Sequence, residues 1–210
     1  MADIKKSHRK NESMDELDYK INNIVATVNI DITQRLNLIK IAQKFENSEY
    51  NPERFPGLII REQNPRATFL IFSTGKMVIT GLEFIQYANK AVSNLVEKLK
   101  KIGINLPMPR ITIQNIVANG NLHTLIDLNK SAILLENAMY EPEIFPGLIY
   151  EMKAPRAVFL LFSTGKFVCT GIKDKNNVEE AIWKVRRIID RLELTKEKLI
   201  KREEEELIFL

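Results

Sequence analysis

The pattern of apolar and polar residues along the chain predicts both helices and strands. Apolar residues recur every three or four positions in 88–99 and again in 178–192, which predicts two long amphipathic helices, the first stopped by Gly103. Shorter helical stretches are expected at 36–47 and 130–137. Apolar and β-branched runs bounded by turn signals predict strands at 24–30, 58–61, 67–72, 76–80 and 111–122, and the middle three recur 90 residues later.

The chain contains an internal duplication. Residues 140–171 repeat residues 50–81 at a fixed offset of 90, with 21 of 32 positions identical, and Asn-Ile-Val-Ala recurs at 23–26 and 115–118. A period of this length is too long for a solenoid and suits two half-domains related by a pseudo-twofold axis. We expect four segments: a flexible basic and polar extension at 1–20, repeats at 21–106 and 107–194, and a charged, acidic tail at 195–210.

The strands carry more apolar residues than one covered face needs. Residues 67–72 barely alternate: Phe69 and Ile71 fall on one face, and Leu70 and Phe72 on the other. Only two long helices are available to cover the sheet, so one face is expected to stay apolar and exposed, which is typical of a binding surface. The alternative is a sheet buried on both sides.

Composition narrows the class of protein. The 210 residues are 45% apolar, enough for a packed core, and no window of about 18 apolar residues predicts a membrane-spanning helix. The first 20 residues lack the apolar stretch of a signal peptide, so an intracellular protein without membrane contact is expected. The single Cys169 cannot form an internal disulfide, which agrees with that compartment.

Candidate catalytic chemistry is sparse. The two histidines, His8 and His123, and one cysteine do not form a zinc-binding spacing, and nucleophile-elbow, Walker and dinucleotide-binding motifs are absent from the sequence. Paired carboxylates remain open because acidic residues are common, but no motif indicates them. We expect a protein without enzymatic activity, catalytic residues, cofactor or metal.

The repeated strings resemble the TATA-box-binding protein family over residues 21–194, in both copies. The resemblance rests on Asn-Ile-Val-Ala, Tyr-x-Pro-Glu-x-Phe-Pro-Gly-Leu-Ile and Phe-Ser-Thr-Gly-Lys followed by Thr-Gly. It implies an α+β fold, a pseudo-symmetric saddle of two similar repeats with a curved antiparallel sheet and helices on the convex face. It also implies a general transcription initiation factor that binds the minor groove of A·T-rich (TATA-box) promoter DNA.

The resemblance also assigns the DNA-contacting residues. The family inserts apolar wedges into the minor groove and kinks DNA by about 80°, both carried over from the family. The intercalating positions match Phe55, Phe72, Phe145 and Phe162. The minor-groove positions match Asn23, Val25, Leu70, Val78, Thr80, Asn115, Val117, Leu160, Val168 and Thr170. The phosphate-contacting positions match Arg61, Thr74, Lys76, Thr164 and Lys166.

Charge differs between the two repeats. Where the second repeat would carry the counterpart of Arg61, the sequence has Glu151, which cannot donate to a phosphate. Residues 21–106 carry 11 basic and 7 acidic side chains, whereas 107–194 carry 11 and 10. We therefore expect the second half to hold DNA more weakly.

The resemblance implies protein partners as well. Glu141, Glu143 and Ile144 match the family's loop that binds transcription factor B, and RNA polymerase would follow through the initiation complex. The protein is expected to be a monomer on DNA and to self-associate weakly when free. The acidic tail and Phe-Pro-Gly-Leu-Ile in both loops favour an archaeal protein of the cytoplasm or nucleoid; a eukaryotic one would be nuclear.

Two alternatives stay open. The chain could be a divergent paralogue that acts mainly as a protein-binding scaffold at promoters with weak DNA selectivity. Glu151 supports this alternative. It could instead be a related saddle domain of the kind attached to some nucleases and glycosylases. Against the second, the sequence ends about 16 residues after the second repeat.

Overall fold

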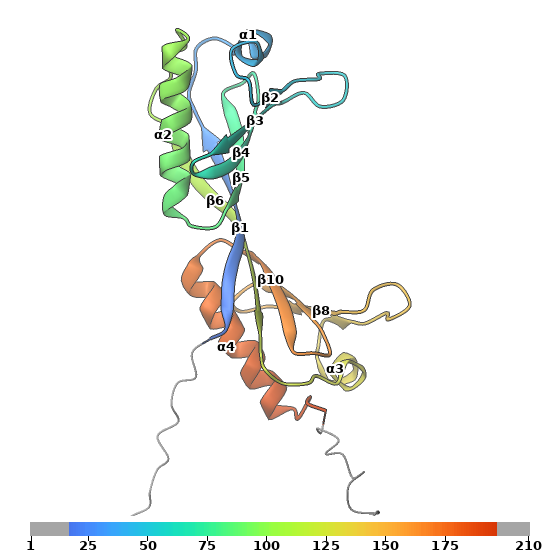
Figure 1. Ribbon diagram of the computed structural model, residues 1–210. Coiled ribbons are helices and arrows are strands. Elements are labelled where there is room, and N and C mark those ends of the chain that lie inside the picture. The colour runs from blue at the N-terminus through green and yellow to red at the C-terminus, as the bar shows by residue number, and fades with distance from the viewer. Residues whose placement is uncertain (1–16, 197–210) are drawn as a thin grey trace, which may run out of the picture.

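A computed structural model describes residues 17–196, and their ten strands form one antiparallel sheet. The strand order is β2-β3-β4-β5-β1-β6-β10-β9-β8-β7. The order in the second repeat is therefore the reverse of that in the first, and the repeats meet at β1 and β6 (Figure 1). The first repeat contributes β1 (Tyr19–Asn29), β2 (Ser48–Glu49), β3 (Leu58–Gln63), β4 (Arg66–Ile71) and β5 (Lys76–Leu82). The second contributes β6 (Arg110–Asn121), β7 (Ala138–Met139), β8 (Leu148–Met152), β9 (Ala157–Leu161) and β10 (Lys166–Ile172).

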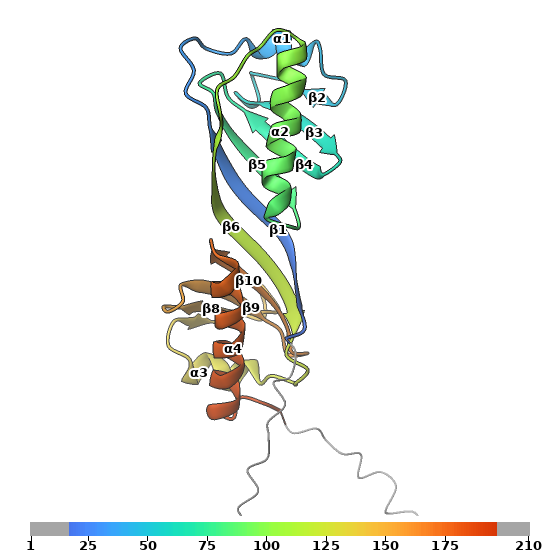
Figure 2. The ribbon, with the colours of Figure 1, turned by 90° about the vertical axis from the view of Figure 1, so that its left-hand side faces the viewer.

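Two long helices cover one face of this sheet. Helices α2 (Gln86–Lys101) and α4 (Lys175–Arg191) lie on the same side, one over each half (Figure 2). Their apolar stripes, including Leu95 and Val185, are fully buried against sheet residues such as Phe69 and Phe159. The short helices α1 (Leu38–Ala42) and α3 (Leu128–Leu134) lie at the two ends. The predicted α+β saddle with helices on one face is confirmed.

Local sequence explains where the helices begin and end. The side chains of Asn37 and Asp127 accept hydrogen bonds from backbone N–H groups in the first turns of α1 and α3, and Asp174 does the same for α4. After α2 the chain reverses at Gly103, whose φ of 85° favours glycine. The predicted stop of the first long helix is therefore confirmed.

Several predicted boundaries are wrong. Strand β1 begins at Tyr19 and not at 24, so residues 19 and 20 belong to the sheet and not to the N-terminal extension. Helix α1 is shorter than 36–47, because the Ser48 hydroxyl donates to the carbonyls of Ala42 and Phe45 and turns the chain. Helix α3 starts at Leu128, two residues before the predicted 130–137. The two-residue strands β2 and β7 were not predicted.

Two further expectations concern the ends of the chain and the membrane. Residues 1–16 of the predicted N-terminal extension and residues 197–210 of the predicted acidic tail lie outside the described residues. Within residues 17–196, none of the helices has the length and apolar character needed to cross a bilayer.

Candidate nucleic-acid interface

The face of the sheet opposite α2 and α4, called the concave face below, carries half-buried apolar side chains in rows. In β5 the side chains alternate between buried Met77 and Ile79 and half-buried Val78 and Thr80. Strand register places Val78 beside Leu70. The predicted second apolar face is thus present. The row of the first half reads Ile59, Leu70, Val78, Thr27, and that of the second reads Ile149, Leu160, Val168, Asn119.

Two asparagines and two valines occupy the centre of the concave face. Asn23 pairs with Val117, and Val25 pairs with Asn115, where β1 and β6 run side by side. All four side chains are half-buried. The duplicated Asn-Ile-Val-Ala strings therefore meet at the pseudo-twofold axis, as two copies of one motif on paired antiparallel strands must.

The orientation of the two central amides is fixed by the backbone. Asn23 Oδ1 accepts the N–H of Gly81 at 2.8 Å, and Asn115 Oδ1 accepts the N–H of Gly171 at 2.9 Å. A backbone N–H can only donate, so the atom that faces it is the oxygen. Both glycines have φ near +82°, at a register shift in β5 or β10 that brings the N–H toward the asparagine. The amide nitrogens remain as hydrogen-bond donors.

The hydroxyls of the central threonines belong to the same clusters. Thr80 Oγ1 lies 3.1 Å from Asn23 Oδ1, and Thr170 Oγ1 accepts from Asn115 Nδ2 at 3.0 Å. An Asn side chain has two N–H groups, so this bond leaves one donor on Asn115. The centre of the face thus combines apolar surface with a few oriented donors.

Each end of the concave face carries a pair of phenylalanines. The ring centroids of Phe55 and Phe72 are 5.8 Å apart with an interplanar angle of 67°, and those of Phe145 and Phe162 are 6.0 Å apart at 68°. These edge-to-face pairs stabilise each ring against the other. A hollow of about 330 Å³ beside Phe72 is lined by apolar and polar side chains of the first half. All four rings are half-buried, and their role as wedges stays a prediction from the resemblance.

Glycine makes room for each phenylalanine pair. A Cβ atom on Gly147 would lie 2.7 Å from Cε1 of Phe145 and 3.0 Å from Cε1 of Phe162. The equivalent atom on Gly57 would lie 2.6 Å from Cε1 of Phe55. The repeated Phe-Pro-Gly therefore has a steric reason, because the ring folds back over the glycine two residues later.

The candidate phosphate contacts lie at the margins of the concave face. Thr74, Lys76, Thr164 and Lys166 are exposed on the two hairpins that follow the phenylalanines. Arg61 is exposed too, but its guanidinium lies 3.5 Å from the carboxylate of Glu49 on β2. Each of these side chains could donate to a phosphate.

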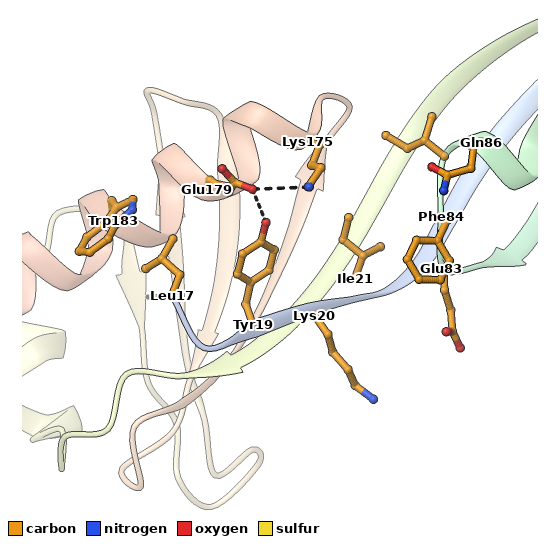
Figure 3. Close-up of a pocket in the computed structure, with 11 residues that line it drawn as sticks. Leu17, Tyr19, Lys20, Ile21, Glu83, Phe84, Gln86, Lys175, Glu179 and Trp183 are labelled. Carbon is orange, nitrogen blue, oxygen red and sulfur yellow. Dashed lines mark hydrogen bonds and ion pairs between the residues drawn. The ribbon is translucent and has the colours of Figure 1, made fainter. Parts of the chain in front are cut away.

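The concave face contains a cation that sequence reasoning missed. Lys20 pairs with Asn119 of the second repeat through the first residues of β1. Figure 3 shows Lys20 pointing away from the helix side, toward which Tyr19 and Ile21 point. The second half thus has a lysine beside its sheet although Glu151 replaces the arginine. Four further residues of the two rows were missed as well: Thr27, Ile59, Asn119 and Ile149. Ile59 lies in an apolar run between Leu58 and Ile60, and strand parity places it on the opposite face from both, so parity could have found it.

The loop expected to bind a protein partner projects from the same side as its counterpart in the first repeat (Figure 1). Between β7 and β8, Ile144 is 79% exposed although it is apolar. Glu141 and Glu143 are exposed beside it, and the Glu141 carbonyl accepts the N–H groups of Ile144 and Phe145. The loop is therefore a tight turn that presents two carboxylates and one apolar side chain.

The helix side has a hollow of about 790 Å³ where the two repeats meet (Figure 3). There the Tyr19 hydroxyl donates to Glu179 of α4 at 2.6 Å. Burial, and then the hydrogen bond to this carboxylate, raise the pKa of Tyr19 well above its usual value. The contact fixes the start of β1 to the second half, which positions Lys20 on the opposite face.

Comparison with known proteins agrees with this geometry. The family model described as "Transcription factor TFIID (or TATA-binding protein, TBP)" matches residues 18–102 and 110–192. The chain belongs to this family. It is 50% identical over 201 residues to a TATA-box-binding protein of Sulfolobus acidocaldarius, covering 93% of this chain and 98% of that one.

Other members of the TATA-binding protein family are similarly close. A TATA-box-binding protein of Pyrobaculum aerophilum is 51% identical over 168 residues, covering 80% of this chain and 83% of the relative. The solved structure of Methanococcus jannaschii TBP has a TM-score of 0.76 at 37% identity, covering 83% of this chain and 99% of that one. The family consists of general transcription factors and not of enzymes, and its relatives here are archaeal.

Proposed function

We propose that the concave face binds the minor groove of A·T-rich promoter DNA and bends it, and that the bound protein recruits transcription factor B and, through it, RNA polymerase. The observation that carries the proposal is the orientation of Asn23 and Asn115. Their oxygens accept backbone N–H groups, so their nitrogens can donate to a ligand, that of Asn115 through the one N–H that Thr170 does not use. The protein acts as a monomer on DNA and uses no cofactor.

The chemistry of the groove supports this assignment. In the minor groove both A·T and T·A present only the acceptors A N3 and T O2, whereas G·C adds the guanine amino donor. Oriented amide donors therefore suit A·T pairs. The flanking valines and leucines, Val25, Val117, Val78, Val168, Leu70 and Leu160, form an apolar surface that leaves a guanine amino group without an acceptor.

The phenylalanine pairs supply the bend. Apolar side chains that enter base steps unstack them and kink the duplex away from the protein, at a cost of a few kcal/mol per step. Two paired rings at each end of the face would produce two kinks, one per repeat. The phosphate-contacting residues of the two hairpins would then meet the backbone beside each kink.

Fluorescence anisotropy tests the DNA preference. At near-physiological salt, we expect at least a tenfold preference for a TATA-containing duplex over a G·C-rich duplex of equal length. Asn115→Asp keeps the acceptor for the Gly171 N–H but removes the donor, and it should lower affinity at least tenfold. Asn89→Asp adds the same charge on exposed α2 and should change affinity little. Equal affinity of the two duplexes for the native protein would contradict the proposal.

A second measurement tests bending. Energy transfer between dyes at the two ends of the duplex should rise on binding, and Phe145→Ala with Phe162→Ala should reduce it. If that double variant bends DNA as the native protein does, the second pair is not a wedge.

Recruitment is tested on the protein–DNA complex: Glu141→Arg with Glu143→Arg should abolish capture of transcription factor B, while Glu53→Arg in the first repeat should not.

A second candidate function is favoured by Glu151. A promoter scaffold with weak DNA selectivity would bind both duplexes weakly and equally, yet still bind transcription factor B through the loop around Ile144. The comparison of the two duplexes and the bending measurement separate these two functions.

A further inference from the structure

One amide breaks the pseudo-symmetry of the concave face. Asn119 of β6 pairs with Val168, and in the first half Thr27 of β1 pairs with Val78. The two residues are therefore equivalent in position but differ in chemistry: a hydroxyl on one side and an amide on the other. Thr27 and Asn119 are both half-buried.

The hydroxyl in the first half is part of a completed chain of hydrogen bonds. Lys173 Nζ donates to Gln114 Oε1 at 3.0 Å, and Gln114 Nε2 donates to Thr27 Oγ1 at 2.9 Å. An ammonium can only donate, which fixes the glutamine oxygen toward Lys173 and its nitrogen toward Thr27. The Thr27 hydroxyl is thus already an acceptor within the protein.

The equivalent chain in the second half is broken. Ninety-two residues before Gln114 stands Asn22, which is one methylene shorter, and ninety before Lys173 stands Glu83, which cannot donate. Among residues 17–196, no donor reaches Asn119 Oδ1, although this oxygen is buried. A buried carbonyl oxygen without a partner is destabilising, so a ligand that supplies a donor gains by satisfying it.

The minor groove offers one such donor, the amino group of guanine. The oxygens of Asn23 and Asn115 are already used, because each accepts both a backbone N–H and the hydroxyl of Thr80 or Thr170. The terminal torsion of an asparagine is broad, so Asn119 can turn its oxygen to the groove. Resting on the proposed function, we propose that Asn119 accepts a hydrogen bond from a guanine amino group, so that the second half tolerates a G·C pair that the first half rejects.

This difference makes binding directional. On an A·T-rich element with one G·C pair off centre, the protein turns so that its second half covers that pair. Asn119 is thus a specificity-determining residue of the DNA site, and Thr27 is its selective counterpart.

A self-complementary A·T duplex tests the inference without knowledge of the binding orientation. A G·C pair is placed at each position of one half in turn, or symmetrically in both halves, and affinity is measured by anisotropy. A mismatched pair typically costs about tenfold in affinity, roughly additively. At one position, we expect a single G·C pair to lower affinity by less than about threefold. The symmetric substitution should lower affinity by about tenfold, since one of its two G·C pairs must lie under the first half.

Two variants assign the effect to the amide. Asn119→Thr restores the residue of the first half, so a single G·C pair at that position should now cost about tenfold and the symmetric pair about a hundredfold. Asn22→Gln leaves Asn119 in place but supplies the missing donor. In this variant too, a single G·C pair should lower affinity more than it does in the native protein. It also serves if Asn119→Thr folds poorly.

The outcomes separate the two proposals. If the native protein prefers the all-A·T duplex but loses additively with one and two G·C pairs at every position, the inference about Asn119 is wrong and minor-groove binding stands. If tolerance persists in both variants, Asn119 is not its cause and the inference is likewise wrong. If A·T-rich and G·C-rich duplexes bind equally, the proposed function itself fails.

Discussion

At the scale of single residues, Gly147 and Gly57 control the geometry of the phenylalanine pairs. Neither glycine has a positive φ. Each is needed because a phenylalanine ring lies where a Cβ atom would be. The ring is the free end of a side chain and can move, so a methyl group should displace the ring and leave the backbone in place. The fold and the wedge can therefore be separated by one small substitution.

We expect Gly147→Ala to lower DNA affinity by about tenfold, while the free energy of unfolding falls by less than about 2 kcal/mol. The reason is that the Phe145 ring must leave its edge-to-face contact with Phe162. Anisotropy and urea unfolding measure the two effects. Gly57→Ala is the matched variant and should act alike through Phe55. Native affinity in both variants would show that the pair geometry is unimportant for binding.

At the scale of elements, strands β3 and β8, each second from an edge of the sheet, differ in the charge they carry on the concave face. Arg61 lies next to Thr68 in the first half, and Glu151 lies next to Val158 in the second. The Glu151 carboxylate cannot donate to a phosphate and would repel it. The lysine at the start of β1 partly offsets this in the second half, but it lies at the centre of the sheet and not at its edge.

Glu151→Arg should therefore tighten DNA binding and steepen its salt dependence. Each added phosphate contact raises the magnitude of the log–log salt slope by about 0.9. Anisotropy titrations at several salt concentrations measure the slope. Glu180→Arg makes the same change of charge on exposed α4, on the opposite face, and should alter the slope far less. Equal slopes for the two variants would mean that β8 does not approach the phosphate backbone.

The start of β1 depends on a contact between elements that are 160 residues apart in sequence. Removing the Tyr19 hydroxyl with Tyr19→Phe should lower the free energy of unfolding by about 1 kcal/mol at neutral pH, because Glu179 loses a donor. The folded pKa of Tyr19 is raised, so this contribution is complete below the usual tyrosine pKa near 10 and is lost as pH rises above it. Urea unfolding of both proteins at pH 7 and pH 10.5 should show the difference shrinking; a difference that grows with pH would contradict it.

Sequence reasoning predicted the interiors of the elements better than their ends. The long helices follow from their own periodicity, and the second apolar face follows from strands such as 67–72 that lack alternation. The start of β1 could not be predicted locally, since Tyr19 to Ile21 are held by β6 and α4. Asn119 and Gln114 were missed for a related reason: their roles depend on register shifts between β1 and β6, which residue parity does not reveal.

At the scale of the whole molecule, the two repeats share one sheet. Strands β1 and β6 pair along ten residue positions, and β10 pairs with β6, so the core of one half continues into the other. Although the sequence predicts two similar repeats, the five strands of each repeat end at β1 or β6, and the outer edge of that strand is paired only by the other repeat. We therefore expect the described part of the chain to unfold as one cooperative unit.

The single cysteine tests this cooperativity. Cys169 is 1% exposed on the helix-facing side of β10, and burial raises its pKa to about 12. At pH 8 about one thiol in 10⁴ would be ionised, so a thiol reagent should label it only when the structure opens. The labelling rate in low urea should rise with a slope equal to that of global unfolding. Cys169→Ser with Ser163→Cys moves the thiol to an exposed hairpin and should label rapidly without urea. A Cys169 slope near half the global value would show instead that the second half opens by itself, and the shared strands would then not couple the repeats.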